Sequence, residues 1–328
     1  MASDRIKIIF NPAAARGRAG EVVNRLRSAL AAVGNRAEID WVGTKHRGHA
    51  VTLAREAAKA GFSTVVAMGG DGTVHEVVNG LMQVDAGARP ALAIVPVGSG
   101  NDFVLGTGLE RNPFSALKGA IQRSDAGARW IDVGLARDNL GRFEHFINVI
   151  GIGLDASVNY HTRQIPLLRG FAMYFAALAR ALTSNYGAVP MELQIDGGQP
   201  VLRRVLMLAV ANGTREGGGF NITPKADAGD GQLDLAMIGP VSRLRLLQII
   251  PDVMAGAHGR HPEITLRRIQ QARIWSSQPL LSHFDGEMFS WREDGAHEIE
   301  ISVIQRAIRV VAPCAPPQAT SRTRPVGS

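Results

Sequence analysis

Residues 64–82 read TVVAMGGDGTVHEVVNGLM, and this stretch decides the fold. A short β-branched run leads into a glycine-rich turn, after which Val74, Val77, Val78 and Leu81 recur along one helix face. A strand joined by a tight turn to an amphipathic helix is the repeating unit of a parallel α/β sheet. The pattern therefore predicts a strand at 64–68 and a helix at 73–82.

The same alternation of strands and helices extends through the first 130 residues, whereas the remainder consists mainly of strands without regular intervening helices. The first part predicts strands at 5–10, 36–42 and 91–97 and helices near 22–30 and 48–60. Later strands, with helical segments only at 167–182 and 243–254, are predicted at 143–149, 191–195, 205–210, 233–238 and 299–303. We therefore expect an α/β domain with a parallel sheet at 1–130, a mainly antiparallel β-sandwich at 131–312, and a disordered tail at 313–328.

Composition narrows the class of protein. The 328 residues include one cysteine, Cys314, which excludes an intrachain disulfide framework and favours a reducing compartment. The first residues do not resemble a signal peptide, and no apolar run reaches the roughly 18 residues that span a bilayer, so we expect a cytoplasmic location. The net charge of +7 favours anionic partners. Without a long basic block, nucleic acid is not expected; an anionic membrane surface or plain solubility fits better.

Three unusual loops each follow a predicted strand, at the edge where parallel sheets bind ligands. The strongest is GGDGT at 69–73, because glycine lets a backbone approach a phosphate and a helix N-terminus offers free N–H groups. Asp71 in this loop suits magnesium binding or proton transfer. Thr73 and Glu76 fit a capping box, so an ordinary capped turn is the alternative interpretation.

The other two loops are weaker signals individually. GSGND at 98–102 combines glycines with short polar side chains, and NPAAARG at 11–17 contains Arg16, which could pair with a phosphate or stay solvated. Neither loop matches the Walker A motif or the GxGxxG fingerprint, which excludes the common nucleotide-binding classes by their own motifs. Together the three loops predict a nucleotide site of another kind.

Eight short motifs occur in a fixed order between about residues 5 and 312. They are Asn11-Pro12, Gly69 to Thr73 with Glu76, Pro96 to Phe103, Gly151 to Ala156, Asn212-Gly213, Gly217 to Gly219, Asp230 to Asp234, and Asp285-Gly286-Glu287. In this order they resemble the diacylglycerol kinase/sphingosine kinase superfamily, in its bacterial soluble lipid kinase branch. The resemblance implies an α/β nucleotide domain like that of NAD and diacylglycerol kinases, followed by a β-sandwich lipid-substrate domain.

The resemblance also implies an activity, in which the γ-phosphoryl group of ATP passes to a lipid hydroxyl with Mg²⁺ as cofactor. Diacylglycerol, giving phosphatidic acid, is the expected acceptor, and a sphingoid base, ceramide or another lipid is the alternative. An NAD kinase shares the GGDG loop, but the Asp285-Gly286-Glu287 and GSGND motifs favour the lipid branch. A catalytically silent lipid-binding protein is the hypothesis from another class. We expect peripheral membrane contact, and a homodimer is one option that residue order does not decide.

Matching the family's motifs position by position predicts the site. The nucleotide is expected at Asn11, Thr44, Gly69, Gly70, Asp71, Gly72, Thr73, Val74, His75, Glu76, Ser99, Asn101 and Asp102. Ser99 replaces the family's usual threonine and keeps its hydroxyl. Glu287 is expected to act as general base with Asp71 organising magnesium and phosphate, although the two roles could be reversed. A structural Mg²⁺ is expected at Asp230, with the carbonyl groups of Asp227 and Gln232; a metal-free Asp-Gly turn is the alternative.

Overall fold

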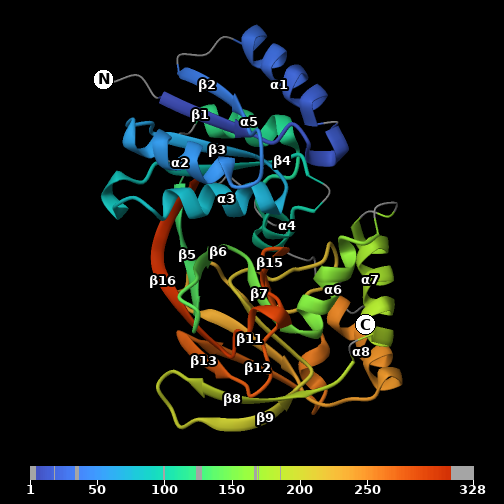
Figure 1. Ribbon diagram of the computed structural model, residues 1–328. Helices are drawn as coiled ribbons and strands as arrows, with labels where there is room; N and C mark the ends of the chain where they lie inside the picture. Colours follow the sequence, from blue (N-terminus) through green and yellow to red (C-terminus); the bar gives the residue numbers. More distant parts are fainter. Residues whose placement is uncertain are drawn as a thin grey trace, which may run out of the picture.

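A computed structural model describes residues 5–17, 19–33, 37–98, 100–122, 128–165, 168, 170–184 and 186–311. The chain forms two lobes, with the N-terminal elements in one and helices α6, α7 and α8 along one side of the other (Figure 1). Among the described residues, no helix has both the length and the apolar character needed to cross a bilayer.

The N-terminal lobe is a parallel sheet covered on both faces. Its strands are β1 (Arg5–Phe10), β2 (Glu38–Gly43), β3 (Thr64–Gly69) and β4 (Ala91–Pro96), in the order β2-β1-β3-β4. Side chains alternate between the two faces of a strand. Val65 and Ala67 therefore pack under α2 (His49–Lys59) and α3 (Asp71–Leu81), and Val66 and Met68 pack under α1 (Ala19–Val33) and α5 (Pro113–Gln122). A short helix, α4 (Asp102–Thr107), follows β4.

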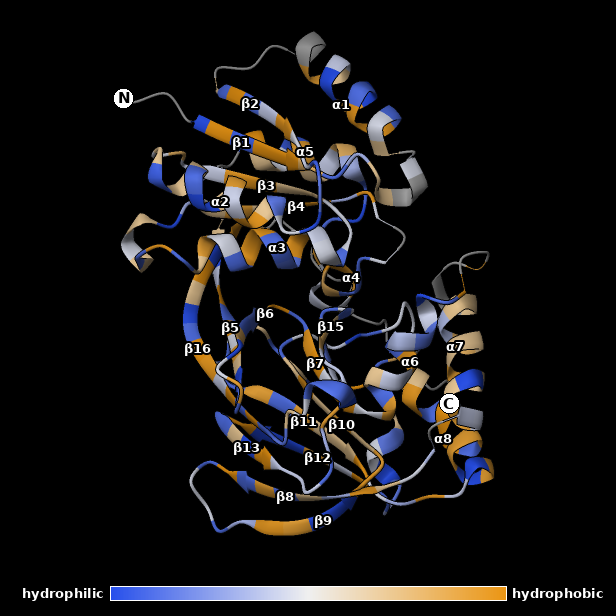
Figure 2. Ribbon diagram, viewed as in Figure 1, coloured by the Kyte–Doolittle hydropathy of each residue, from blue (hydrophilic) through white to orange (hydrophobic). Residues whose placement is uncertain are grey.

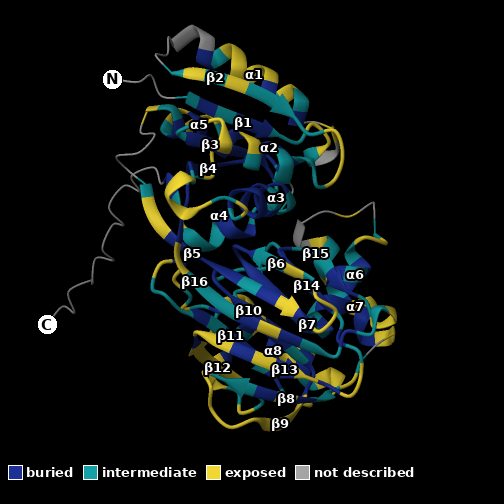
Figure 3. Cartoon of the chain, turned by 60° about the vertical axis from the view of Figure 1, so that its left-hand side comes forward, coloured by how far each residue is buried: buried dark blue, intermediate teal, exposed yellow. Residues whose placement is uncertain are grey.

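The C-terminal lobe packs two sheets face to face. One is antiparallel, in the order β12-β11-β10-β7-β14-β15. Its strands are β7 (Val149–Gly153), β10 (Met207–Ala211), β11 (Leu233–Ile238), β12 (Ile264–Ile269), β14 (Ser282–Phe284) and β15 (Glu287–Ser290). The other contains β5 (Ala128–Asp138), β6 (Phe143–Phe146), β8 (Val189–Ile195), β9 (Val201–Val205), β13 (Gln271–Trp275) and β16 (Glu298–Val311). Aromatic side chains such as Phe146 and Phe284 fill the space between the sheets, and exposed residues gather on the edge strand β9 (Figure 3).

Three helices add a third layer to this lobe. They are α6 (Leu154–Thr162), α7 (Gly170–Ser184) and α8 (Arg243–Ala255). Leu178 of α7 and Leu246 of α8 pack with Ile238 and Ile264 of the six-stranded sheet. The parallel sheet and the six-stranded sheet therefore bury apolar side chains on both faces. In Figure 2, hydrophobic colours run along β1 and β3.

The last strand joins the two lobes. The long strand β16 pairs with β5 and β13 in the C-terminal lobe, and Val310 pairs with Leu92 of β4 in parallel. The N-terminal sheet therefore continues into the second lobe as one ten-stranded sheet. Such a covalent and hydrogen-bonded connection fixes how the lobes face each other.

The fold class predicted from the sequence is confirmed, with local corrections. The strand predicted at 143–149 is two strands, because the N–H groups of Ile147 and Asn148 donate to the Asp285 carboxylate instead of to a neighbouring strand. The strand predicted at 205–210 is also divided, at Leu206, whose N–H donates to Ile238. Helix α6 was not predicted. Residues 36, 167 and 313–328 lie outside the described residues.

Candidate active site

A cleft of about 670 Å³ lies between the lobes. Both lobes contribute to its walls. The N-terminal lobe supplies Asn11, Thr44, Gly70, Asp71, Gly72, Thr73, Glu76, Gly98 and Gly100, among others. The C-terminal lobe supplies Met173, Tyr174, Gly218, Asp285, Gly286 and Glu287. The cleft therefore gathers residues that are as far as 276 positions apart, from Asn11 to Glu287.

Glycines of the loops that follow β3 and β4 line one wall of the cleft. The loops after β3 and β4 pack backbone against backbone, because a Cβ at Gly98 would collide with Gly70. A Cβ at Gly100 would lie 2.5 Å from Asp71 Oδ2. Val97 and Gly98 both donate N–H groups to the Gly69 carbonyl, at 3.0 and 3.1 Å. Only glycine permits this approach, so these loops form one rigid unit.

Helix α3 begins without a side-chain cap. Its N-cap residue is Gly70, and the helix starts at Asp71 rather than at Thr73. The predicted capping box is wrong, because the Glu76 carboxylate accepts the N–H groups of Gly48 (2.7 Å) and Ala50 (3.1 Å) at the start of α2. An uncapped helix N-terminus lining a cleft is suited to bind a phosphate group.

Several carboxyl groups are gathered beside this helix terminus. Burial, together with the nearby carboxylates of Asp102 and Asp285, raises the pKa of Asp71 to about 8. Backbone N–H groups of Phe103 and Asp102 bond to the Asp71 carboxylate and oppose the shift. A crowded group of carboxylates is relieved by a cation, and Mg²⁺ prefers carboxylate and phosphate oxygens. Asp71 is therefore placed where a magnesium–phosphate complex would be stabilised.

Glu287 reaches the same place from the C-terminal lobe. It begins β15, and its Oε1 lies 3.4 Å from the point that a Cβ on Gly72 would occupy. Its Oε2 pairs with Arg47 (2.6 Å) and Arg163 (2.8 Å). The carboxylate is about one third exposed (35%), so a substrate in the cleft can reach it. Two carboxylates from opposite lobes thus line one cleft.

Helix α3 also carries a buried contact between the lobes. His75 Nδ1 lies 3.0 Å from Asp285 Oδ2, and His75 Nε2 lies 2.9 Å from Glu144 Oε1. Burial alone would lower the pKa of His75, but Asp285 and Glu144 outweigh it and raise the pKa to about 10. The side chains of His75 and Val74 are absent from the walls of the cleft; Val74 packs in the core.

The order of motifs can now be compared with known families. Residues 5–134 match the diacylglycerol kinase catalytic domain, and residues 148–312 match the YegS C-terminal NAD kinase beta sandwich-like domain. The chain belongs to the diacylglycerol kinase superfamily. It is 34% identical over 270 residues to a probable lipid kinase YegS-like of Chromohalobacter salexigens, covering 81% of each chain. Family membership makes the protein a phosphotransferase of the lipid kinase type.

Other relatives agree with this assignment. A diacylglycerol kinase of Mycobacterium tuberculosis is 29% identical over 312 residues, covering 94% of this chain and 95% of its own. The solved structure of a diacylglycerol kinase from Bacillus anthracis superimposes with a TM-score of 0.66 at 21% identity, over 96% of this chain and 98% of its own. At this identity the superposition concerns the fold alone. The family predicted from the eight motifs is thereby confirmed.

Several predicted nucleotide contacts of this lipid kinase hold the loops together instead of lining the cleft. Asp102 accepts the Gly218 N–H at 2.9 Å, which links α4 to the loop at 217–219 in the other lobe. The Asn101 side-chain amide donates to the Gly98 carbonyl. Gly69 is also absent from the walls. Ser99 lies outside the described residues.

The residues predicted for the structural Mg²⁺ form a turn before β11. Asp227 Oδ1 accepts the Gly229 N–H, and Asp230 Oδ1 accepts the Gln232 N–H. Asp230 Oδ2 is buried without a hydrogen-bond partner and lies 3.4 Å from an Arg268 nitrogen. This acidic oxygen, which accepts no hydrogen bond, fits a divalent cation.

Asp234, on β11, belongs to the same acidic group, although no motif match assigned it a role. Its Oδ2 is also buried without a partner. Burial raises the pKa of Asp234 to about 6; Arg268 opposes the shift, and Asp230 and Asp227 add to it. A cation at the turn would relieve this crowding, and Mg²⁺ there stays a prediction.

Sequence reasoning missed the two arginines that hold Glu287. Arg47 lies in the loop after the strand predicted at 36–42, and Arg163 comes directly after helix α6, which was not predicted. Nothing in the spacing of either residue ties it to position 287. The only available signal, for Arg47, was its place three residues after Thr44, which the family motif had already assigned to the nucleotide site.

Proposed function

We propose that this lipid kinase transfers the γ-phosphoryl group of ATP to a hydroxyl group of a membrane lipid, with diacylglycerol as the expected acceptor. The observation that carries the proposal is the meeting of Glu287 with the uncapped N-terminus of α3, which begins at Asp71, in a single cleft. The names of the relatives, lipid kinase and diacylglycerol kinase, support it.

In the proposed reaction, the oxygen of the lipid hydroxyl attacks the γ-phosphorus while Glu287 accepts the hydroxyl proton. The bond between that phosphorus and the β,γ-bridging oxygen breaks, and ADP leaves. The N–H groups that begin α3 hold the phosphates, and Asp71 would hold Mg²⁺, which would neutralise charge that develops on the phosphate oxygens. Arg47 and Arg163 orient the base and add positive charge beside the transferred group.

A second cavity supports a lipid acceptor. About 80 Å³ in volume, it is lined by apolar side chains of α6, α7 and α8, including Leu154, Leu178, Leu246 and Ile250. Tyr174 lines both this apolar cavity and the cleft. Pockets for small molecules usually measure about 300–1,000 Å³. A lipid chain therefore requires the helical layer to open. Because Tyr174 borders both spaces, the hydroxyl end of a lipid bound in this way would point toward the cleft and Glu287.

The outer face of α8 supports contact with a membrane. Leu244, Leu247, Pro251 and Met254 are exposed at intervals of three and four residues, which places them along one side of the helix. This stripe, together with a net charge of +7, suits the boundary of an anionic bilayer. Helix α8 also lines the apolar cavity with its other side. A membrane bound to the exposed side would therefore be separated from the cavity by this one helix, which would shorten the path of a lipid from the bilayer.

The test is a phosphoryl-transfer assay with ATP, Mg²⁺ and mixed micelles that contain diacylglycerol, sphingosine or ceramide. Glu287→Gln is expected to lower kcat by roughly 10²–10⁴-fold while nucleotide affinity changes little. Glu298→Gln is the matched control, because Glu298 is also a carboxylate paired with an arginine, Arg273 at 2.8 Å, but it lies outside the cleft. Full turnover in Glu287→Gln would reject this base, and transfer to NAD alone would favour an NAD kinase.

A further inference from the structure

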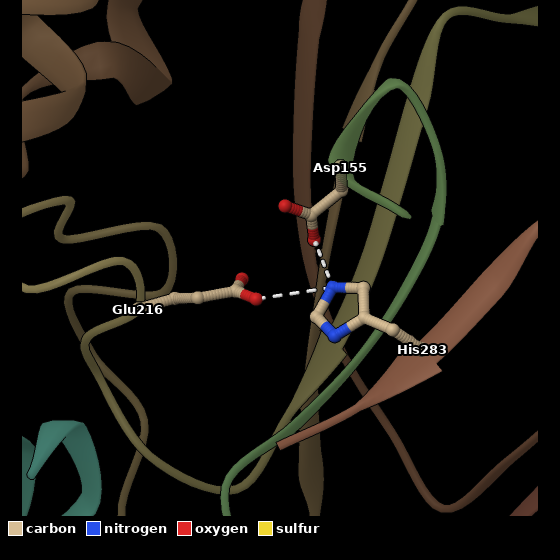
Figure 4. A group of neighbouring side chains, drawn as sticks. All are labelled: Asp155, Glu216 and His283. Atoms are coloured by element: carbon tan, nitrogen blue, oxygen red, sulfur yellow. Dashed lines mark ion pairs between the residues drawn. The ribbon is translucent and has the colours of Figure 1, made fainter. Parts of the chain in front are cut away.

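A group of three polar side chains lies beside the apolar cavity, and the proposed reaction does not use it. His283 comes from β14, Asp155 from the first turn of α6, and Glu216 from the loop after β10. His283 is fully buried, and Asp155 and Glu216 side chains are 11% and 12% exposed. Figure 4 shows both carboxylates directed at the same ring nitrogen.

Several polar atoms of these three side chains form no hydrogen bond. His283 Nε2 lies 3.4 Å from Asp155 Oδ2 and 3.1 Å from Glu216 Oε1, yet it has no hydrogen-bond partner. A ring nitrogen carries at most one hydrogen, which points along a single direction and cannot serve two oxygens on different sides. Asp155 Oδ2 and Glu216 Oε2 are also buried without a hydrogen-bond partner. Buried polar atoms in native proteins are rarely left in this state.

The donor atoms have the spacing of a metal-binding site. One donor atom from each of the three residues lies within 4.8 Å of the others. Donors held about 2.1 Å from a shared ion are separated by roughly 3.0 Å in octahedral and 3.4 Å in tetrahedral geometry. The two measured separations, 3.1 and 3.4 Å, fall in this range. A divalent cation would also neutralise the two buried carboxylates, whose burial without compensation is costly.

The backbone leaves room for an ion. Gly151 of β7 pairs directly with His283 of β14, and a Cβ at position 151 would fall among the donor atoms, in collision with Asp155 Oδ2 and His283 Nε2. The absence of a side chain at Gly151 therefore creates the space in which the three donors converge. Asp155 and Glu216 also line the apolar cavity, so further coordination positions can take a water or a ligand oxygen.

We propose that Asp155, Glu216 and His283 bind one divalent first-row metal ion, separate from the Mg²⁺ proposed for the cleft and from the one predicted beside Asp230. Imidazole suits Zn²⁺ and related ions, carboxylate suits Mn²⁺, and a mixed set of this kind disfavours Mg²⁺ and Ca²⁺, which prefer oxygen alone. The site does not rest on the proposed kinase reaction. It would hold the loop of Glu216 against α6 and β14 at the wall of the apolar cavity.

The experiment titrates the full chain, stripped of metal by chelation, with Zn²⁺ and separately with Mn²⁺, in the absence of nucleotide and with excess Mg²⁺ present to fill the oxygen sites predicted at Asp71 and Asp230. Isothermal titration calorimetry is expected to show one high-affinity equivalent. His283→Gln and Glu216→Gln should each weaken binding at least roughly tenfold, since each removes a ligand. His261→Gln is the matched control, because His261 also pairs with a carboxylate, Asp252, but lies outside this group of three residues, and the variant should bind metal as the unaltered chain does.

A second measurement does not depend on how the variants fold. Crystals of the unaltered chain soaked in Zn²⁺ are expected to give an anomalous difference peak between Asp155, Glu216 and His283. A peak only elsewhere, no bound metal in either measurement, or equal affinity in folded His283→Gln would overturn the proposal. In that case the three residues form a closed group of ionised side chains with a protonated histidine.

Discussion

Replacing His75 by glutamine separates the contact between the lobes from the chemistry of the cleft. His75 joins α3 to Asp285 and Glu144 through two bonds of 3.0 and 2.9 Å, and its side chain is buried. A rise in the pKa of His75 from 6.5 to about 10 corresponds to an upper limit of about 5 kcal/mol in stability. Glu144 is 40% exposed, so solvent weakens its share. We expect a loss of about 3 kcal/mol in the free energy of unfolding.

The loss is expected to depend on pH in a defined direction. Because the folded pKa of His75 is higher than the unfolded value, the folded state binds the extra proton. This contribution is fully present below about pH 6.5 and disappears as the pH rises through about 10. In that window the stability of the unaltered protein relative to the variant should fall, by at most about 1.4 kcal/mol per pH unit.

Urea denaturation followed by circular dichroism at pH 6, 8 and 10 measures both effects. The control is His161→Gln, since His161 is also buried but hydrogen-bonds to the Ser184 hydroxyl and not to an acid. It should lose about 1 kcal/mol with no comparable change between the pH values. A loss below about 1 kcal/mol for His75→Gln at pH 6, or a difference that grows with pH, would refute the reasoning.

Two further substitutions test the glycine-lined wall of the cleft and the outer face of α8. Gly100→Ala places a Cβ 2.5 Å from Asp71 Oδ2, so ATP affinity measured by calorimetry should fall at least roughly tenfold; Gly87→Ala, which meets no atom within 4 Å, should bind normally. Leu244→Ser should weaken co-sedimentation with anionic vesicles about fivefold, whereas Leu202→Ser on β9, with nearly the same exposure (67% against 68%), should not. Equal binding within either pair would contradict the corresponding interpretation.

The sequence was most informative where local periodicity and backbone requirements decide the structure. The strand at 64–69 and helix α8 follow directly from apolar spacing, and the glycine-rich loops at 69–73 and 98–102, expected together at one edge of the sheet, both line the cleft. The start of α3 was misplaced because Thr73 and Glu76 fit a local capping pattern. In the structure the Glu76 carboxylate instead accepts N–H groups at the start of α2, and the order of residues contains no signal for this long-range contact.

Pairings across long separations were also inaccessible to the sequence. Arg163 and Glu287 are 124 residues apart, and the contact depends on α6, whose weak apolar pattern did not predict a helix. The cluster of Asp155, Glu216 and His283 draws on three separate elements. Motif matching predicts residues that a family shares, whereas such contacts depend on the packing of this particular chain.

The Asp285-Gly286-Glu287 motif divides two tasks between its acidic residues. Asp285 is buried and accepts the N–H groups of Ile147, Asn148 and Val149, in addition to its contact with His75. These bonds anchor the turn to β7 in one lobe and to α3 in the other. Glu287, two residues later, is consequently held beside the first turn of the same helix α3. Because one short motif contacts that helix twice, a shift of the lobes that broke the His75 contact would also withdraw the carboxylate from the cleft.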